Sequence, residues 1–254
     1  MTTLVTRDHT ATRETQFAYF DEVLGHPDWR GRTILDFGGN WGIFLRRAEG
    51  VDHDDYWCLD VHEPMLERGR REFPRAQFVH YDRFSAEYNP DGVPGLPLPE
   101  LGLHFDFILA FSVFTHHYPS EMLEQVAALR RMLAPGGMLA FTFCDARYDC
   151  ALSDPSLQPG SDVRKNLYRV QVHTPQEIEE LVARAEQARW CVAVDGELFV
   201  EPGEELSRRE RRGRPWESYC AYFTTETMQS LFPDATIHAP VAPEWQHCCV
   251  VRNG

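Results

Sequence analysis

Apolar positions follow two spacings along the chain. Short apolar runs rich in β-branched and aromatic residues alternate with segments in which apolar residues return every three or four positions. The first spacing predicts strands and the second predicts amphipathic helices. Predicted strands cover about 32–37, 56–61, 77–81, 105–111, 138–143, 235–241 and 247–252. Predicted helices cover about 12–24, 64–73, 119–133, 175–188 and 225–232, with one more from the glycine cluster after residue 37 to about residue 48. The alternation predicts an α/β fold.

Three segments refine this picture. The run 105–111 is almost continuously apolar, as is typical of a strand buried on both faces of a parallel sheet. Residues 84–103 hold four prolines and are predicted to form an irregular loop. Residues 190–200 contain two apolar runs around Asp195-Gly196, which predicts a β-hairpin. We predict a single domain over 1–254, with a helical cap at 1–30 and a substrate-specificity insertion at 146–223, between the fifth and sixth strands.

Composition excludes several classes of partner. The formal net charge of -14 argues against nucleic acid and anionic membranes, because such a surface repels phosphates. No apolar run approaches the ~20 residues of a membrane span, and the first residues are polar, so we expect a cytoplasmic protein. The seven cysteines contain no CxxC pair, so we expect neither a disulfide framework nor a metal. His247-Cys248-Cys249 is better explained as a buried strand than as a metal site, because neighbouring strand residues point to opposite faces.

The chemistry is concentrated at the ends of the predicted strands. The first strand ends in Asp36 and leads into a glycine-rich turn, Gly38-Gly39-Asn40-Trp41-Gly42. Glycines allow positive φ and a close approach of ligand to backbone. A carboxylate beside such a turn repels a pyrophosphate but suits a cationic or amino-bearing ligand. The second strand ends in Asp60, which is 24 positions after Asp36. In nucleotide-binding units an acid at the end of the second strand accepts hydrogen bonds from the ribose hydroxyls.

The order of these motifs resembles the class I S-adenosylmethionine-dependent methyltransferases. The resemblance covers roughly residues 30–145 and depends on five stations, which are Leu35-Asp36-Phe37-Gly38 with Gly42, Leu59-Asp60, Tyr81-Asp82, Phe105-Asp106-Phe107-Ile108 and Leu133-Ala134-Pro135-Gly136-Gly137. It implies a Rossmann-like three-layer sandwich, with a seven-stranded, mostly parallel sheet whose last strand is antiparallel. It also implies the cofactor S-adenosyl-L-methionine (SAM).

The resemblance further implies which residues bind this cofactor. The first turn would hold the methionine part, Asp60 the ribose and Asp82 the adenine. The full set of implied cofactor residues is Asp36, Phe37, Gly38, Gly39, Asn40, Gly42, Asp60, Val61, Tyr81, Asp82, Arg83 and Phe111.

Asn40 is a departure from the family, which usually has a glycine at this position. Asparagine tolerates positive φ better than other residues with side chains, so the turn is still expected to form. Two alternatives follow. A nicotinamide-dependent dehydrogenase is disfavoured because its Gly-x-Gly-x-x-Gly fingerprint is absent. A cofactor-binding module that does not catalyse stays open, with Asn40 as the damaging residue.

Residues on the acceptor side carry less specific signals. His116 and His117 follow the fourth strand and are candidate catalytic bases, since histidine titrates near neutrality; the alternative is a helix-start turn with exposed rings. The candidate substrate residues are Asp145, Trp216, Tyr219 and Tyr222, whose aromatic members are as well explained by core packing. The arginine-rich segment 208–214 is explained either as a dock for an anionic substrate or as a solvated loop.

We therefore predict a SAM-dependent methyltransferase that acts on a small molecule, with O-methylation favoured. The acidic charge and the lack of a second recognition domain favour a small acceptor. Only one of the 25 basic residues is lysine, which fits a GC-rich genome and a specialised-metabolite or sugar-tailoring pathway. The competing hypothesis is methylation of a protein or carrier-bound substrate through the arginine-rich segment. The sequence makes no prediction of the oligomeric state.

Overall fold

The computed structural model describes residues 15–85, 87–147, 163, 167, 173–194, 197–202, 219–242 and 244–254. Within these residues the main sheet has seven strands in the order β3-β2-β1-β4-β5-β10-β9. They are β1 (Ile34–Phe37), β2 (Tyr56–Asp60), β3 (Gln77–His80), β4 (Phe105–Ala110), β5 (Leu133–Phe143), β9 (Thr236–His238) and β10 (His247–Arg252). β10 pairs antiparallel with both β5 and β9, whereas the pairs among β1 to β5 are parallel. This sheet confirms the predicted fold class.

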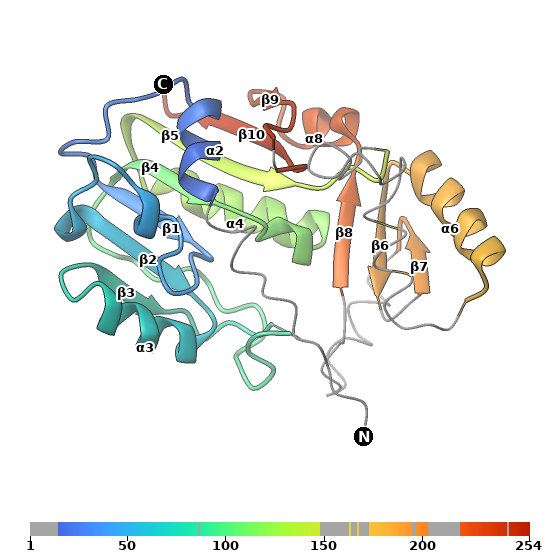
Figure 1. The fold of residues 1–254 in the computed structure, drawn as a ribbon, viewed down its shortest axis with the longest axis horizontal. Helices are drawn as coiled ribbons and strands as arrows, with labels where there is room; N and C mark the ends of the chain where they lie inside the picture. Colours follow the sequence, from blue (N-terminus) through green and yellow to red (C-terminus); the bar gives the residue numbers. More distant parts are fainter. Residues whose placement is uncertain are drawn as a thin grey trace.

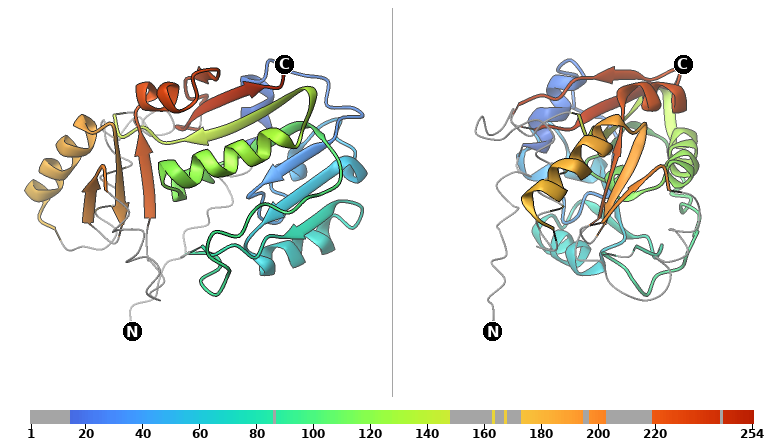
Figure 2. Two further views of the ribbon diagram at one scale, coloured as in Figure 1. Left: turned by 180° about the vertical axis from the view of Figure 1, so that it is seen from behind. Right: turned by 90° about the vertical axis from the view of Figure 1, so that its right-hand side faces the viewer.

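Helices cover both faces of the main sheet (Figures 1 and 2). On one face α2 (Gln16–Val23) and α3 (Glu63–Glu72) bury Phe20 and Leu66 in one core. On the other face α4 (Pro119–Arg131) and α8 (Thr225–Leu231) bury Val126 and Met228 in a second core. Consecutive strand residues divide between these cores because they point to opposite faces, so Cys248 faces the first core and Cys249 the second.

A smaller sheet lies beyond the end of β5, on the right in Figure 1. It has the order β7-β6-β8, with β6 (Trp190–Val194), β7 (Glu197–Val200) and β8 (Tyr219–Phe223). Its outer face packs on α6 (Pro175–Gln187), and its inner face joins the core under α4. The predicted hairpin is confirmed by the antiparallel pairing of β6 with β7. β8 was not predicted as a strand.

The helix predicted after the glycine turn is wrong. The structure has turns followed by a short 3-10 helix, η1 (Leu45–Arg47). Gly42 has a φ of 83°, and Ala48 is already extended, with φ -69° and ψ 121°. The segment between them is too short to recover the cost of starting an α-helix.

Other predicted boundaries shift by a few residues. β5 starts at Leu133 instead of residue 138, because Leu133 already pairs with Phe105 of β4, and the Pro-Gly-Gly stretch forms an irregularity before pairing resumes at Met138. The sixth strand is shorter than predicted and covers only Thr236–His238. The described residues of 84–103 form only isolated bridges, as expected of a loop.

Candidate functional site

A cavity lies at the edge of the main sheet where β1, β2 and β4 end. Residues from the glycine turn, from the ends of β2, β3 and β4, from α4 and from β8 line it. The lining residues include Phe37, Gly38, Asn40, Asp60, Val61, Tyr81, Arg83, Glu87, Tyr88, Phe111, Val113, His116, His117, Gln125 and Tyr219. The structure thus brings together residues that are far apart in the sequence, from Gln16 to Tyr219. Ligands of parallel α/β sheets bind at this carboxyl edge.

The glycine turn has the backbone that its sequence predicts. Gly38, Asn40 and Gly42 have φ values of 73°, 58° and 83°, so asparagine does occupy the left-handed region here. The Gly38 N–H donates to the Leu59 carbonyl at 2.8 Å. A Cβ on Gly38 would lie 2.4 Å from Cγ2 of Val113, so this glycine is required by a close approach as well as by its φ.

Asp60 is held by the turn before any ligand binds. Its Oδ2 accepts the Asn40 N–H at 2.7 Å, and its Oδ1 accepts the His62 N–H at 2.8 Å. The side chain is buried at the cavity wall. Burial raises the pKa of this carboxyl, while the two backbone hydrogen bonds oppose that rise. Asp60 therefore has the position that a ribose-binding acid needs.

Asp36 lies beneath the turn and does not line the cavity. Its Oδ2 accepts a 2.5 Å hydrogen bond from the Tyr56 hydroxyl, and Gly39 packs directly over its carboxyl. Burial raises the pKa of Asp36 to about 7; the Tyr56 bond opposes this and the charge of Asp60 adds to it. Gly42 is also outside the lining, because it faces Phe73 and Phe78. Asp36, Gly39 and Gly42 therefore support the turn from outside the cavity lining. The resemblance had implied that they contact the cofactor.

The three implied cofactor residues after β3 do not all line the cavity. Tyr81 and Arg83 line the cavity, whereas Asp82 is exposed and receives a hydrogen bond from Asn89 at 3.1 Å. Arg83 donates to both carboxylate oxygens of Glu124 on α4, at 2.9 and 3.1 Å, and to the Leu96 carbonyl at 3.0 Å. Arg83 therefore joins the 84–103 loop to α4, and Asp82 is not placed to contact a ligand in the cavity.

The two histidines differ in their surroundings. They belong to the turn around the 3-10 helix η3 (Phe114–His116) that follows β4. His116 has Nδ1 3.5 Å from Glu87 Oε2, and its ring stacks on Tyr219 with centroids 6.2 Å apart. His117 is more enclosed, with Nδ1 2.9 Å from the Val113 carbonyl, and burial lowers its pKa. Of the two, His116 has the geometry of a base with an acid partner.

The three candidate substrate residues that the structure describes do not come together. Tyr219 on β8 lines the cavity. Tyr222, on the same strand, is buried with α6 in the core of the smaller sheet. Both carboxylate oxygens of the buried Asp145 accept hydrogen bonds from Arg147. Trp216 and the arginine-rich segment 208–214 lie outside the described residues.

Sequence reasoning missed several residues of the cavity wall, among them Gln125 and Glu87. Gln125 is 2% exposed, although it shares the apolar stripe of α4 with Met122 and Leu129. A polar residue within an apolar stripe was the available signal. Glu87, the partner of His116, had no such signal because it lies in an irregular loop.

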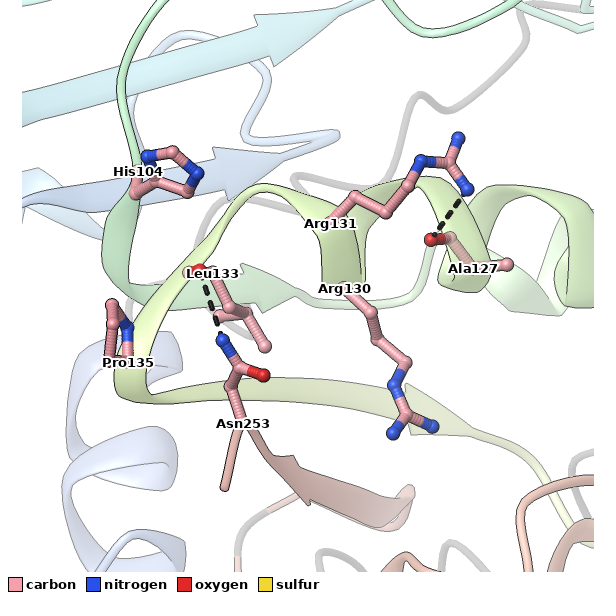
Figure 3. A pocket seen from close by; sticks show the side chains of 7 residues that line it. All are labelled: His104, Ala127, Arg130, Arg131, Leu133, Pro135 and Asn253. Atoms are coloured by element: carbon pink, nitrogen blue, oxygen red, sulfur yellow. Dashed lines mark hydrogen bonds between the residues drawn. The ribbon is translucent and has the colours of Figure 1, made fainter.

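A second hollow lies at the opposite edge of the sheet and is shown in Figure 3. It is lined by His104, Ala127, Arg130, Arg131, Leu133, Pro135 and Asn253, near the amino ends of β4 and β5. Arg130 is paired with Asp234 at 2.6 Å, and Arg131 and Asn253 donate to the backbone carbonyls of Ala127 and Leu133. Its polar groups serve the fold, and we assign the functional site to the other edge.

Among the residues that the structure describes, no group of three or more His, Cys, Asp or Glu side chains is placed to hold a metal ion. Among the same residues, no helix has the length and apolar character needed to cross a membrane.

Comparisons with known proteins agree with this geometry. A family model described as a methyltransferase domain matches residues 35–139. A sequence comparison with curated proteins finds no match. Among solved structures, magnesium protoporphyrin IX methyltransferase from Synechocystis PCC 6803 is 13% identical, with a TM-score of 0.51 over 100% of this chain and 89% of that chain.

Two further structures share the fold. An S-adenosylmethionine-dependent methyltransferase from Clostridium acetobutylicum is 11% identical, with a TM-score of 0.53 over 99% of this chain and 95% of that chain. CalS10, an amino pentose methyltransferase from Micromonospora echinaspora, is 16% identical, with a TM-score of 0.50 over 100% of this chain and 99% of that chain. Residues 35–139 therefore match a methyltransferase domain, and the strand order and the cavity at the carboxyl edge agree with the Rossmann-like fold of these methyltransferase structures.

Proposed function

We propose that this protein transfers a methyl group from SAM to a small-molecule acceptor, with transfer to oxygen favoured. The observation that carries the proposal is a single cavity lined by Gly38, Asn40, Asp60 and His116. The residues fit the cofactor, because a Cβ on Gly38 would fill space beside Val113 and Asp60 offers carboxylate oxygens at the wall. When bound there, SAM would supply an activated methyl group.

The chain's own contribution is mainly positioning. The turn at Gly38 and Asn40 would hold the methionine part, and Asp60 would accept hydrogen bonds from the ribose hydroxyls. Holding two reactants in line contributes ~7–11 kcal/mol in favourable cases. The acidic Asp60 also suits a cofactor whose reactive centre is cationic.

His116 is the proposed base. An alcohol or phenol keeps its proton at neutral pH, so transfer to oxygen needs a group that accepts it. Glu87 lies beside Nδ1 at 3.5 Å and would orient the ring, so the proton would go to Nε2. This pairing supports an acceptor that loses a proton on transfer, such as the oxygen of an alcohol or phenol.

The rings around the cavity support a small acceptor. Tyr88 packs edge-on to His116 with centroids 5.5 Å apart, and Tyr219 stacks on the same ring with centroids 6.2 Å apart, so three rings border the cavity at the base. The neighbour CalS10 acts on an amino pentose, which fits a role in sugar or specialised-metabolite tailoring. The alternative of a protein or carrier-bound substrate depends on the arginine-rich segment 208–214, which lies outside the described residues.

Titration calorimetry with SAM tests the cofactor step. We expect the wild-type protein to bind, and Asp60→Ala to weaken binding by about 100-fold, since a buried ligand acceptor is lost. Asp54→Asn is the matched control, because Asp54 is an exposed acid that pairs with Arg75 on the surface. Absence of SAM binding by the wild-type protein would refute the proposal.

Turnover tests the role of His116. A panel of hydroxyl- and amino-bearing small molecules, followed by release of S-adenosylhomocysteine, identifies an acceptor. With that acceptor we expect His116→Ala to lower kcat by about 10²- to 10⁴-fold while SAM affinity is unchanged. His104→Ala, in the hollow of Figure 3, is the control. If kcat is the same in both variants, His116 is not the base.

A further inference from the structure

Gln125 is a buried amide in the wall of the cofactor cavity. It lies near the middle of α4, is 2% exposed and lines the cavity. Its Oε1 atom is buried and has no hydrogen-bond partner among the described residues. A buried acceptor without a partner is uncommon in folded proteins, because its desolvation is not compensated.

The neighbouring His117 determines which amide atom faces the cavity. His117 Nδ1 lies 2.9 Å from the Val113 carbonyl, which only accepts, so Nδ1 carries the proton. In the neutral ring Nε2 then has only a lone pair and accepts from Gln125 Nε2 at 3.1 Å. Burial lowers the pKa of His117, which favours that neutral ring. Oε1 of Gln125 is therefore the atom left to accept a bond from a ligand.

Contacts of the next residue locate this acceptor within the cavity. Glu124 receives two hydrogen bonds from Arg83, which follows β3 and lines the same cavity. This turn of α4 therefore lies against the end of β3. In the sheet order β3-β2-β1, the glycine turn follows β1 and Asp60 ends β2. In SAM the ribose joins the methionine to the adenine. With methionine at the turn and ribose at Asp60, the adenine side of the cavity is the β3 side.

We propose that Oε1 of Gln125 accepts a hydrogen bond from the exocyclic amino group of adenine. The inference rests on the proposed function, since it requires SAM in this cavity. It assigns to a helix residue the part predicted for Asp82, which is exposed and outside the cavity lining. A purine with an oxo group in place of this amino group would bring its own acceptor oxygen against Oε1 of Gln125. Two acceptors cannot form a hydrogen bond, so the site would discriminate against this purine.

Calorimetry with S-adenosylhomocysteine and S-inosylhomocysteine, which carries oxo in place of amino, tests the proposal. We expect the wild-type protein to bind the adenosyl compound at least about tenfold more tightly. Gln125→Met removes the acceptor, so its affinity for the adenosyl compound should fall about 10- to 100-fold and the preference should disappear. Gln187→Met, at an exposed position on α6, should keep the wild-type preference.

Gln125→Glu covers the case in which the methionine variant does not fold. A protonated glutamic acid keeps a donor for His117 and a carbonyl acceptor for the ligand, so this variant should retain the preference. A folded Gln125→Met that keeps the full preference overturns the inference, as does a wild-type protein that binds both compounds equally. A wild-type protein that binds neither compound refutes the proposed function instead.

Discussion

The buried Asp36 predicts a pH-dependent stability that a single substitution removes. Asp36 is 2% exposed beneath the glycine turn, and burial raises its pKa to about 7. In the unfolded chain an aspartate titrates near ~3.9. Between these two values the folded protein keeps a proton that the unfolded chain has lost. Asp36→Asn has no carboxyl group to titrate, and its amide oxygen can still accept a hydrogen bond from the Tyr56 hydroxyl.

The size of the effect follows from the two pKa values. Where the unfolded chain binds one proton fewer, the free energy of unfolding falls by about 1.4 kcal/mol per pH unit. The contribution of Asp36 is fully present below the unfolded pKa and is lost as pH rises through about 7. Between pH 5 and pH 8 the wild-type protein should therefore lose roughly 2–3 kcal/mol relative to Asp36→Asn.

Urea unfolding at several pH values between 5 and 8, at one ionic strength, measures this difference. The two stability curves should diverge up to about pH 7 and run parallel above it. Tyr56→Phe removes a hydrogen bond that favours the ionised carboxylate, so the bend should move to higher pH. Asp54→Asn, at an exposed acid, should follow the wild-type curve. Parallel curves for wild type and Asp36→Asn over the whole range would refute the reasoning.

Substitutions at Gly38, Arg83 and Asn40 test the turn and the loop beside it. Gly38 and Gly102 both have a φ of 73°, so the backbone conformation alone should make alanine at either cost about 1–2 kcal/mol in urea unfolding, with a further cost at Gly38 from the contact with Val113. Only the Gly38 methyl meets Val113, so only Gly38→Ala should also weaken SAM binding in calorimetry. Arg83→Met should lower the free energy of unfolding by about 2–4 kcal/mol, and unchanged stability would contradict its role between loop and helix. Asn40→Val should be less stable than Asn40→Gly by about 2 kcal/mol, because β-branched residues avoid positive φ.

Most of the sheet follows from the apolar pattern, and the exceptions have local causes. Strands β1, β2, β4, β5 and β10 of the main sheet are fully or largely buried, so their sequences are distinctive. The segment after Gly42 has the apolar spacing of a helix, yet the positive φ of Gly42 and the extended Ala48 leave too few residues for one. β8 was missed because its aromatic residues serve two cores, with Tyr219 in one and Tyr222 in the other, so the run shows no polar alternation.

The sequence indicates which residues line the cavity where the backbone decides their position, and fails to do so where a rotamer decides. Gly38 and Asp60 are placed by the strand ends and the turn, and both line the cavity. Asp36, near the end of β1, has its side chain under the glycines against Tyr56, and Asp82, after β3, is exposed and accepts a hydrogen bond from Asn89. Spacing along a strand does not reveal these choices, because they depend on partners that are distant in sequence. Gln125 is the opposite case, because it lines the cavity without following a strand. Only the fold brings α4 to the end of β3.

The bonding of Asp60 explains why this acid can serve the turn and a ligand at once. Each carboxylate oxygen accepts one backbone N–H, from Asn40 at 2.7 Å and from His62 at 2.8 Å. A carboxylate oxygen has two lone pairs, so each oxygen can accept a second bond from one of two adjacent hydroxyls. The rotamer is already fixed by the turn, so binding costs little side-chain entropy. The left-handed Asn40 belongs to this arrangement, because its N–H is one of the two donors. The residue that departs from the family's glycine therefore keeps the backbone function of the turn.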